Sequence, residues 1–137
     1  MQIKPTSSPY PEELHHIFIQ TYEELHHAPA PDFETVTKGE KIFAAYIENQ
    51  IVGFVTFWEP DQFIHFLFVD PKFRSRHVGT QLIQTLSSHY GYPLSLKCLS
   101  SNTNALQFYL HTGWKSKETG TSDDGEYYLM QLDMPSD

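Results

Sequence analysis

Apolar residues in the first third of the chain follow a helical period and then become dense, as in strands. Within residues 9–28 the positions expected to face a core are spaced three or four apart, and they are Leu14, Ile17, Phe18, Tyr22 and Leu25. Residues 29–41 are polar and predict a loop with at most a short helical turn. Two β-rich runs, 42–47 and 51–58, are separated by three polar residues, which predicts a hairpin.

The middle of the chain predicts a buried strand, a polar loop and a helix. Phe63–Val69 is apolar at every position except His65, which is typical of a central strand covered on both faces. A polar, basic loop follows as far as His77. Val78–Tyr90 then has a helical stripe of apolar residues, and this stripe consists of Val78, Leu82, Ile83 and Leu86.

The last third predicts a strand at Leu94–Leu99, a helix at 101–112 and a hairpin formed by 114–118 and 127–134. There is no internal repeat and no linker-like stretch, so residues 1–137 are expected to form a single domain. The order of elements is helix, hairpin, strand, helix, strand, helix, hairpin. This order predicts an α/β fold with a mixed sheet packed by helices.

Composition and charge exclude several classes of protein. Apolar residues make up 39% of the 137 and aromatic residues 15%, which excludes a disordered chain. Nine Lys and Arg against 17 Asp and Glu give a net charge of −8, which argues against nucleic-acid or anionic-membrane partners. No apolar run reaches the roughly 20 residues of a membrane span, and no signal stretch follows Met1, so a cytoplasmic protein is expected. The single cysteine, Cys98, allows no intrachain disulfide and no cysteine-based metal site.

A small basic cluster stands out in this acidic chain, at the step from the central strand into the next helix. Strand, loop and helix N-terminus in succession leave several backbone N–H groups free, and the helix dipole adds positive potential. Arginine offers forked donors for phosphate, and a glycine in the first turn allows close approach to the backbone. The residues predicted to bind phosphate are Arg74, Ser75, Arg76, His77, Val78, Gly79 and Thr80. For the charges alone, a solvated loop is the alternative.

The same segment resembles the acetyl-CoA segment of the GNAT (Gcn5-related N-acetyltransferase) superfamily, whose pattern is Arg/Gln-x-x-Gly-x-Gly/Ala and would begin at Arg74. A second stretch, Asn102 to Trp114, is similar to another family signature, with Asn, then Ala, then Phe-Tyr, then Gly and an aromatic residue. The resemblance is good over residues 42–115. It implies a mostly antiparallel central sheet flanked by helices, with acetyl-CoA as the acetyl donor. One residue departs from the pattern, because His77 stands where the family has its first loop glycine.

The resemblance also implies direct transfer of the acetyl group to an amine and roles for particular residues. Backbone groups of Leu67, Phe68 and Val69 would pair with the pantetheine arm, and one N–H group would polarise the thioester carbonyl. Tyr109 would be the general acid that protonates the departing thiolate; the alternative is a core tyrosine on an amphipathic helix. Asn102 would contact the cofactor or cap the helix that follows it.

The acceptor amine must lose a proton before it attacks, and His65 is the predicted general base. It is the only polar residue of the central strand, and strand periodicity places its side chain on the same face as Leu67 and Val69. The alternative is a buried histidine that only bonds a neighbouring carbonyl group. Glu59 and Asp61, just before the strand, are the reserve candidates, acting through water.

The predicted partner is a small-molecule primary amine, since the acidic loop 122–126 favours a small cationic amine over a protein N-terminus or lysine. Homodimers are frequent in the family, so a homodimer is considered, although no residue marks an interface. No metal is expected, because the pairs His15-His16 and His26-His27 are about three helical turns apart, roughly 16 Å. Two rival interpretations are a catalytically impaired CoA-binding sensor of the same fold and an unrelated phosphate- or nucleotide-binding protein.

Overall fold

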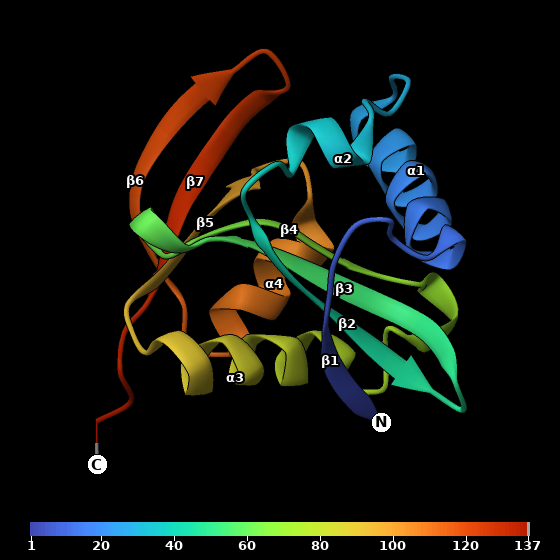
Figure 1. The fold of residues 1–137 in the computed structure, drawn as a ribbon. Helices are drawn as coiled ribbons and strands as arrows, with labels where there is room; N and C mark the ends of the chain where they lie inside the picture. Colours follow the sequence, from blue (N-terminus) through green and yellow to red (C-terminus); the bar gives the residue numbers. More distant parts are fainter. Residues whose placement is uncertain (137) are drawn as a thin grey trace.

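A seven-stranded sheet with helices on both faces forms the framework of the computed structural model, which describes residues 1–136 (Figure 1). The strand order is β1-β2-β3-β4-β5-β7-β6, and every neighbouring pair is antiparallel except β4 and β5. The strands are β1 (Gln2–Thr6), β2 (Lys41–Ile47), β3 (Gln50–Trp58), β4 (Phe63–Val69), β5 (Leu94–Leu99), β6 (Lys115–Ser122) and β7 (Gly125–Leu132). The helices are α1 (Glu12–His26), α2 (Phe33–Val36), α3 (Val78–Tyr90) and α4 (Thr103–His111), with short 3-10 turns η1 (Glu59–Asp61) and η2 (Pro71–Phe73).

The sheet separates two apolar cores, because side chains along a strand alternate between its faces. One core lies under α3 and α4 and takes in residues from β2 to β7. The other core lies under α1 and α2, and within residues 1–136 its buried members on the sheet come from β2, β3 and β4 only. Helices α1 and α2 therefore cover only half of their face of the sheet. The same face of β5, β7 and β6 carries exposed or half-buried residues such as Lys97 and Tyr127.

The predicted mixed, mostly antiparallel sheet flanked by helices is confirmed, and three elements have the predicted bounds: β4, α3 and β5. The first helix is shorter than predicted and begins only after Pro11. The predicted order, which began with this helix, is wrong, because a strand precedes it: β1 pairs antiparallel with β2 at the edge of the sheet. This strand has no apolar alternation, since Ile3 and Thr6 are its only half-buried residues. Pro5 is tolerated there because an edge strand needs a hydrogen-bonding partner on one side only.

Candidate active site

Strands β4 and β5 pair only where they begin, and this is the central feature of the site. The parallel ladder joins Phe63 to Ser95 and Ile64 to Leu96 and then stops. Beyond it β4 continues beside β3, and β5 continues beside β7 (Figure 1). The backbone of Leu67–Val69 therefore has a strand partner on the β3 side alone. Its remaining N–H and C=O groups face the gap between the two strands, and apart from the Val69 carbonyl, which accepts from Arg74, they are free to bind an extended ligand.

A β-bulge in β4 lies at the start of this gap. The register passes from Phe57 opposite Ile64 to Thr56 opposite Phe66, so His65 is the extra residue. The buried Thr56 hydroxyl accepts a hydrogen bond from the Phe66 N–H group at 3.0 Å. A backbone donor that has lost its ladder partner is thus satisfied by a side chain.

The bulge reverses the predicted direction of His65. Its ring stacks on that of Phe66, with centroids 3.9 Å apart and planes inclined by 22°, so both side chains point to the α1 face. Leu67 and Val69 pack against the core under α3 and α4, on the other face. The prediction that these residues share a face with His65 is therefore wrong. A regular strand would have given that arrangement, and the extra residue shifts the alternation by one position.

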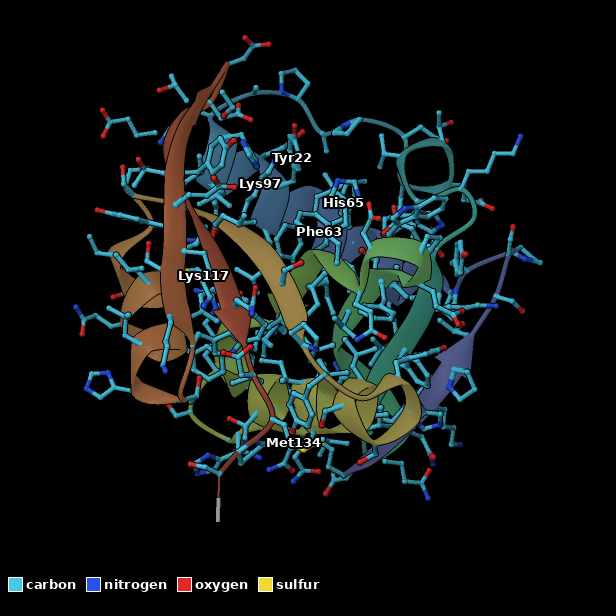
Figure 2. All side chains as sticks on the ribbon, turned by 90° about the vertical axis from the view of Figure 1, so that its left-hand side faces the viewer. Tyr22, Phe63, His65, Lys97, Lys117 and Met134 are labelled. Atoms are coloured by element: carbon cyan, nitrogen blue, oxygen red, sulfur yellow. The ribbon has the colours of Figure 1, made fainter. Side chains whose placement is uncertain are left out.

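Glu40 is the hydrogen-bonding partner of His65, where sequence reasoning had considered a neighbouring carbonyl group. The Nδ1 atom of His65 lies 2.9 Å from Oε2 of Glu40. The histidine side chain is 39% exposed, whereas that of Glu40 is only 7% exposed. Figure 2, seen from the side of the β6–β7 hairpin, labels His65 and Phe63 on β4 and Lys97 on β5. No sequence signal marked Glu40, because the contact joins residues 25 positions apart. The reserve candidates Glu59 and Asp61 lie in the exposed turn η1.

The turn from β4 into α3 brings the predicted phosphate-binding residues together on the surface. Arg74–His77 are exposed. The Nε atom of Arg74 donates to the Val69 carbonyl at 3.3 Å, and the Arg76 guanidinium lies over the Phe73 ring. Within the described residues, Gln81 donates the first backbone bond of α3, to the His77 carbonyl at 3.1 Å. The N–H groups of the three helical residues before Gln81 are therefore available to an anion, as is usual at a helix N-terminus.

The structure gives the backbone conformation of one residue of this turn and the packing of another. His77 has φ 61° and ψ 24°, the left-handed conformation that glycine adopts without strain. This explains why a glycine suits the position and indicates a strained backbone in this chain. Gly79 has ordinary helical dihedrals, and a Cβ built on it would meet the Phe108 ring at 3.4 Å. That separation is an ordinary contact, so packing against α4 does not require a glycine here, and its role in ligand approach stays a prediction.

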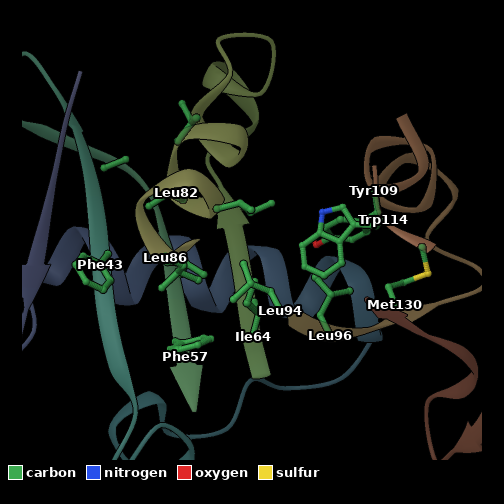
Figure 3. Close-up of a cluster of buried hydrophobic side chains, with 14 of the residues drawn as sticks. Phe43, Phe57, Ile64, Leu82, Leu86, Leu94, Leu96, Tyr109, Trp114 and Met130 are labelled. Carbon is green, nitrogen blue, oxygen red and sulfur yellow. The ribbon is translucent and has the colours of Figure 1, made fainter. Parts of the chain in front are cut away.

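Tyr109 lies on the opposite face of the sheet from His65, in the core under α3 and α4 (Figure 3). Burial, followed by the nearby Cys98, raises the pKa of Tyr109 well above its usual value, so the phenol keeps its proton at neutral pH. Burial also raises the pKa of Cys98 to about 11, so its thiol is not a ready nucleophile. The amide oxygen of Asn102 accepts from the Ala105 N–H group at 3.4 Å, so the capping alternative is the contact observed.

The half of the α1 face that the helices leave uncovered is bounded by polar groups. Lys97 of β5 places its ammonium 4.9 Å from the centre of the Tyr127 ring. At the rim, Nδ1 of His26 lies 3.2 Å from the carboxylate of Asp124, which connects the end of α1 to the β6–β7 turn. A pocket beside this hairpin is lined by Ser100, Thr119, Gly120, Thr121, Glu126, Tyr127 and Tyr128. The face therefore offers both acidic and basic groups to a ligand.

Residues 1–136 contain no group of three or more His, Cys, Asp or Glu side chains that could hold a metal ion. In the same described part of the chain, no helix has the length and apolar character required to span a membrane.

Comparison with solved structures shows the fold. A GCN5-related N-acetyltransferase of Rhodopseudomonas palustris has 20% identity and a TM-score of 0.77, over 97% of this chain and 95% of that chain. A ribosomal-protein-alanine N-acetyltransferase of Brucella melitensis has 15% identity and a TM-score of 0.73, over 98% and 100%. A GNAT family acetyltransferase of Elizabethkingia anophelis, solved with acetyl-CoA bound, has 16% identity and a TM-score of 0.70, over 97% of each chain.

Sequence comparison shows the family. No curated protein sequence matches the chain significantly. The family model described as acetyltransferase (GNAT) family matches residues 11–114, which include the gap between β4 and β5, the turn into α3, and α4. The chain belongs to the GNAT family of acetyltransferases.

Proposed function

We propose that this chain transfers an acetyl group from acetyl-CoA directly to a primary amine. The observation that carries the proposal is the gap between β4 and β5, which has His65 on one face of the sheet and Tyr109 on the other. Two substrates that enter from opposite faces would meet in such a gap, and no covalent enzyme intermediate is needed. The buried, protonated Cys98 gives no support to a route through an acetylated cysteine.

The residues around the gap suit acetyl-CoA as donor. The turn Arg74–Thr80, which is exposed from Arg74 to His77, would present guanidinium and backbone N–H donors to the pyrophosphate. The unpaired side of Leu67–Val69 offers backbone groups to the pantetheine arm, and an N–H group there would stabilise charge on the thioester oxygen. Acetyl-CoA supplies the activated acyl group. The impaired CoA-binding sensor would keep the same donor groups, and it is the less favoured alternative because His65 and Tyr109 lie on the two faces of the sheet as candidate base and acid.

His65 and Tyr109 divide the proton transfers. His65 is partly exposed on the uncovered α1 face, where an acceptor amine can reach it, and an imidazole accepts protons near neutral pH. Tyr109, on the other face, is the proposed proton donor to the thiolate; the burial that raises its pKa keeps it protonated and also makes it a weaker acid than a free phenol. The acidic turn that carries Asp123 and Asp124 favours a small cationic amine as acceptor. The ribosomal-protein-alanine enzyme of similar fold makes a protein N-terminus the second acceptor to test.

Calorimetry with acetyl-CoA followed by an acceptor screen tests the proposal. We expect acetyl-CoA to bind and ATP not to compete, and we expect free thiol to be released with at least one of putrescine, lysine and an alanyl peptide. Arg74→Gln should weaken acetyl-CoA binding by about 10-fold, the lower end for a lost charge-assisted bond. Lys4→Gln, at the far edge of the sheet, is the control and should leave binding unchanged. Stabilisation by ATP without any by CoA would contradict the proposal.

A further inference from the structure

We propose that Glu40 is a positioning residue for the reaction: it holds the Nδ1 proton of His65 and so leaves Nε2 of the imidazole to accept a proton from the acceptor amine. This inference rests on the proposed acetyl transfer and names the group that makes His65 competent for it. The contact itself is direct, since Nδ1 and Oε2 are 2.9 Å apart.

The fold brings Glu40 to His65 through well-defined backbone contacts. Glu40 ends a turn in which its N–H group donates to the Thr37 carbonyl at 2.9 Å and Gly39 has a φ of 85°. The next residue, Lys41, begins β2 opposite Phe57 of β3, and Phe57 lies opposite Ile64 of β4. The carboxylate therefore starts at the level of the sheet where the β4 bulge presents His65.

The burial of the Glu40 carboxylate costs free energy that its contacts offset only in part. Its side chain is 7% exposed, and Oε1 is fully buried without a hydrogen-bonding partner among the described residues. Leaving a buried carboxylate oxygen unpaired costs free energy, so the position of this side chain needs an explanation. In the described part of the chain, no Lys or Arg pairs with Glu40, and His65 is its only ion-pair partner.

The other ionisable groups near Glu40 do not compensate its charge. Tyr10 faces it from the segment before α1, and Glu34 belongs to α2. The pKa of Tyr10 is raised, first by burial and then by the negative charges of Glu34 and Glu40. A neutral phenol and a second carboxylate add no positive charge. Protonation of the His65 imidazole would thus supply the positive charge that the buried Glu40 carboxylate lacks.

The pairing determines which nitrogen of His65 reacts. A carboxylate that accepts the Nδ1–H bond selects one tautomer, in which Nε2 has a free lone pair. An alkylammonium acceptor would give one proton to Nε2 and become a neutral amine. The amine lone pair then forms the C–N bond as the C–S bond breaks, and Tyr109 gives its proton to the thiolate. The second amine proton leaves the new amide nitrogen and returns to the Tyr109 phenolate. The imidazolium, stabilised by Glu40, returns its proton to solvent through its exposed edge.

Nitrogen-15 NMR of the histidines in the full-length chain tests the pairing without an acceptor. The His65→Gln variant assigns the His65 signals. In the parent protein we expect the neutral imidazole to be protonated at Nδ1, and in Glu40→Ala we expect this preference to be lost. Glu40→Asp, which keeps the charge on a shorter side chain, should be intermediate. An unchanged tautomer in Glu40→Ala would overturn the proposal.

Kinetics with the best amine of the acceptor screen test the role. Glu40→Gln should lower kcat about 10- to 100-fold, the loss seen when a carboxylate that orients a metal-bound histidine is changed, with acetyl-CoA affinity unchanged within about twofold. Glu34→Gln, a carboxylate of the neighbouring helix α2, is the matched control and should retain normal kcat. The double variant Glu40→Gln/His65→Gln should be no slower than His65→Gln alone, because Glu40 acts only through His65.

The outcomes separate this inference from the proposed function. Normal kcat in Glu40→Gln, or losses that multiply in the double variant, would overturn the positioning role while acetyl transfer stands. If the parent protein acetylates no amine, the proposed function and the role of Glu40 in catalysis both fail, and the NMR result then describes only a structural pair.

Discussion

Thr56→Val is the substitution that best tests how the β4 bulge builds the site. Thr56 is fully buried on β3, and its hydroxyl accepts the Phe66 N–H group that the bulge removes from the ladder. Valine has nearly the same shape but no acceptor, so the change removes the hydrogen bond with little change in packing volume. The Phe66 N–H group would then be buried without a partner.

The expected cost follows from that unpaired donor. Leaving a buried backbone donor unsatisfied costs about 1–3 kcal/mol in the free energy of unfolding. For a chain of this size, roughly 4 °C of melting temperature is lost per kcal/mol, so Tm should fall by about 4–12 °C. The bulge also directs His65 toward Glu40, so a loosened bulge should lower kcat more than it weakens acetyl-CoA binding.

Urea unfolding, calorimetric Tm and steady-state kinetics measure these effects together. Thr56→Ser is the control, because it keeps the hydroxyl and loses one methyl group, at a cost of about 1 kcal/mol; it should retain normal kcat. The reasoning is refuted if Thr56→Val melts within about 2 °C of the parent protein and turns over at the parent rate, because the hydroxyl would then not support the bulge.

Four further substitutions or treatments probe the site. A Cβ at Gly53 would lie 3.0 Å from the Phe68 carbonyl oxygen, so Gly53→Ala should cost about 1–3 kcal/mol in urea unfolding and weaken acetyl-CoA binding by displacing the end of β4; unchanged binding would contradict this. His77→Gly removes about 1–2 kcal/mol of left-handed strain against about 0.5–1 kcal/mol of added chain entropy, so the urea midpoint should rise slightly, and a lower midpoint would show that the strain is not there. Tyr109→Phe should lower kcat and leave acetyl-CoA affinity within about twofold by calorimetry, as expected of a general acid; the opposite pattern would assign the hydroxyl to binding. Because burial raises the pKa of Cys98 to about 11, the folded protein should not react with an aromatic disulfide at pH 8, and rapid stoichiometric labelling would be evidence against that burial.

Local patterns in the sequence were sufficient for the elements that contain the site. The apolar run of β4, the helical stripe of α3 and the run of β5 each depend on neighbours within one element, and their bounds agree with the structure. The turn with positive potential at Arg74–Thr80 was also predictable, because a strand, a basic loop and a helix N-terminus occur in succession. β1 was missed because an edge strand with few buried side chains has no periodic signal.

Only the tertiary structure decided which groups meet. The register between β3 and β4 creates the bulge, and the bulge turns His65 toward α1 and away from the face of Leu67 and Val69. The partner of His65 is Glu40, which a turn and the alignment of three strands bring to it. Side-chain period and charge are properties of a short segment, so they can be read from the sequence. The pairing of strands depends on how whole cores pack, and one inserted residue in that pairing determined which face of the sheet holds the candidate base.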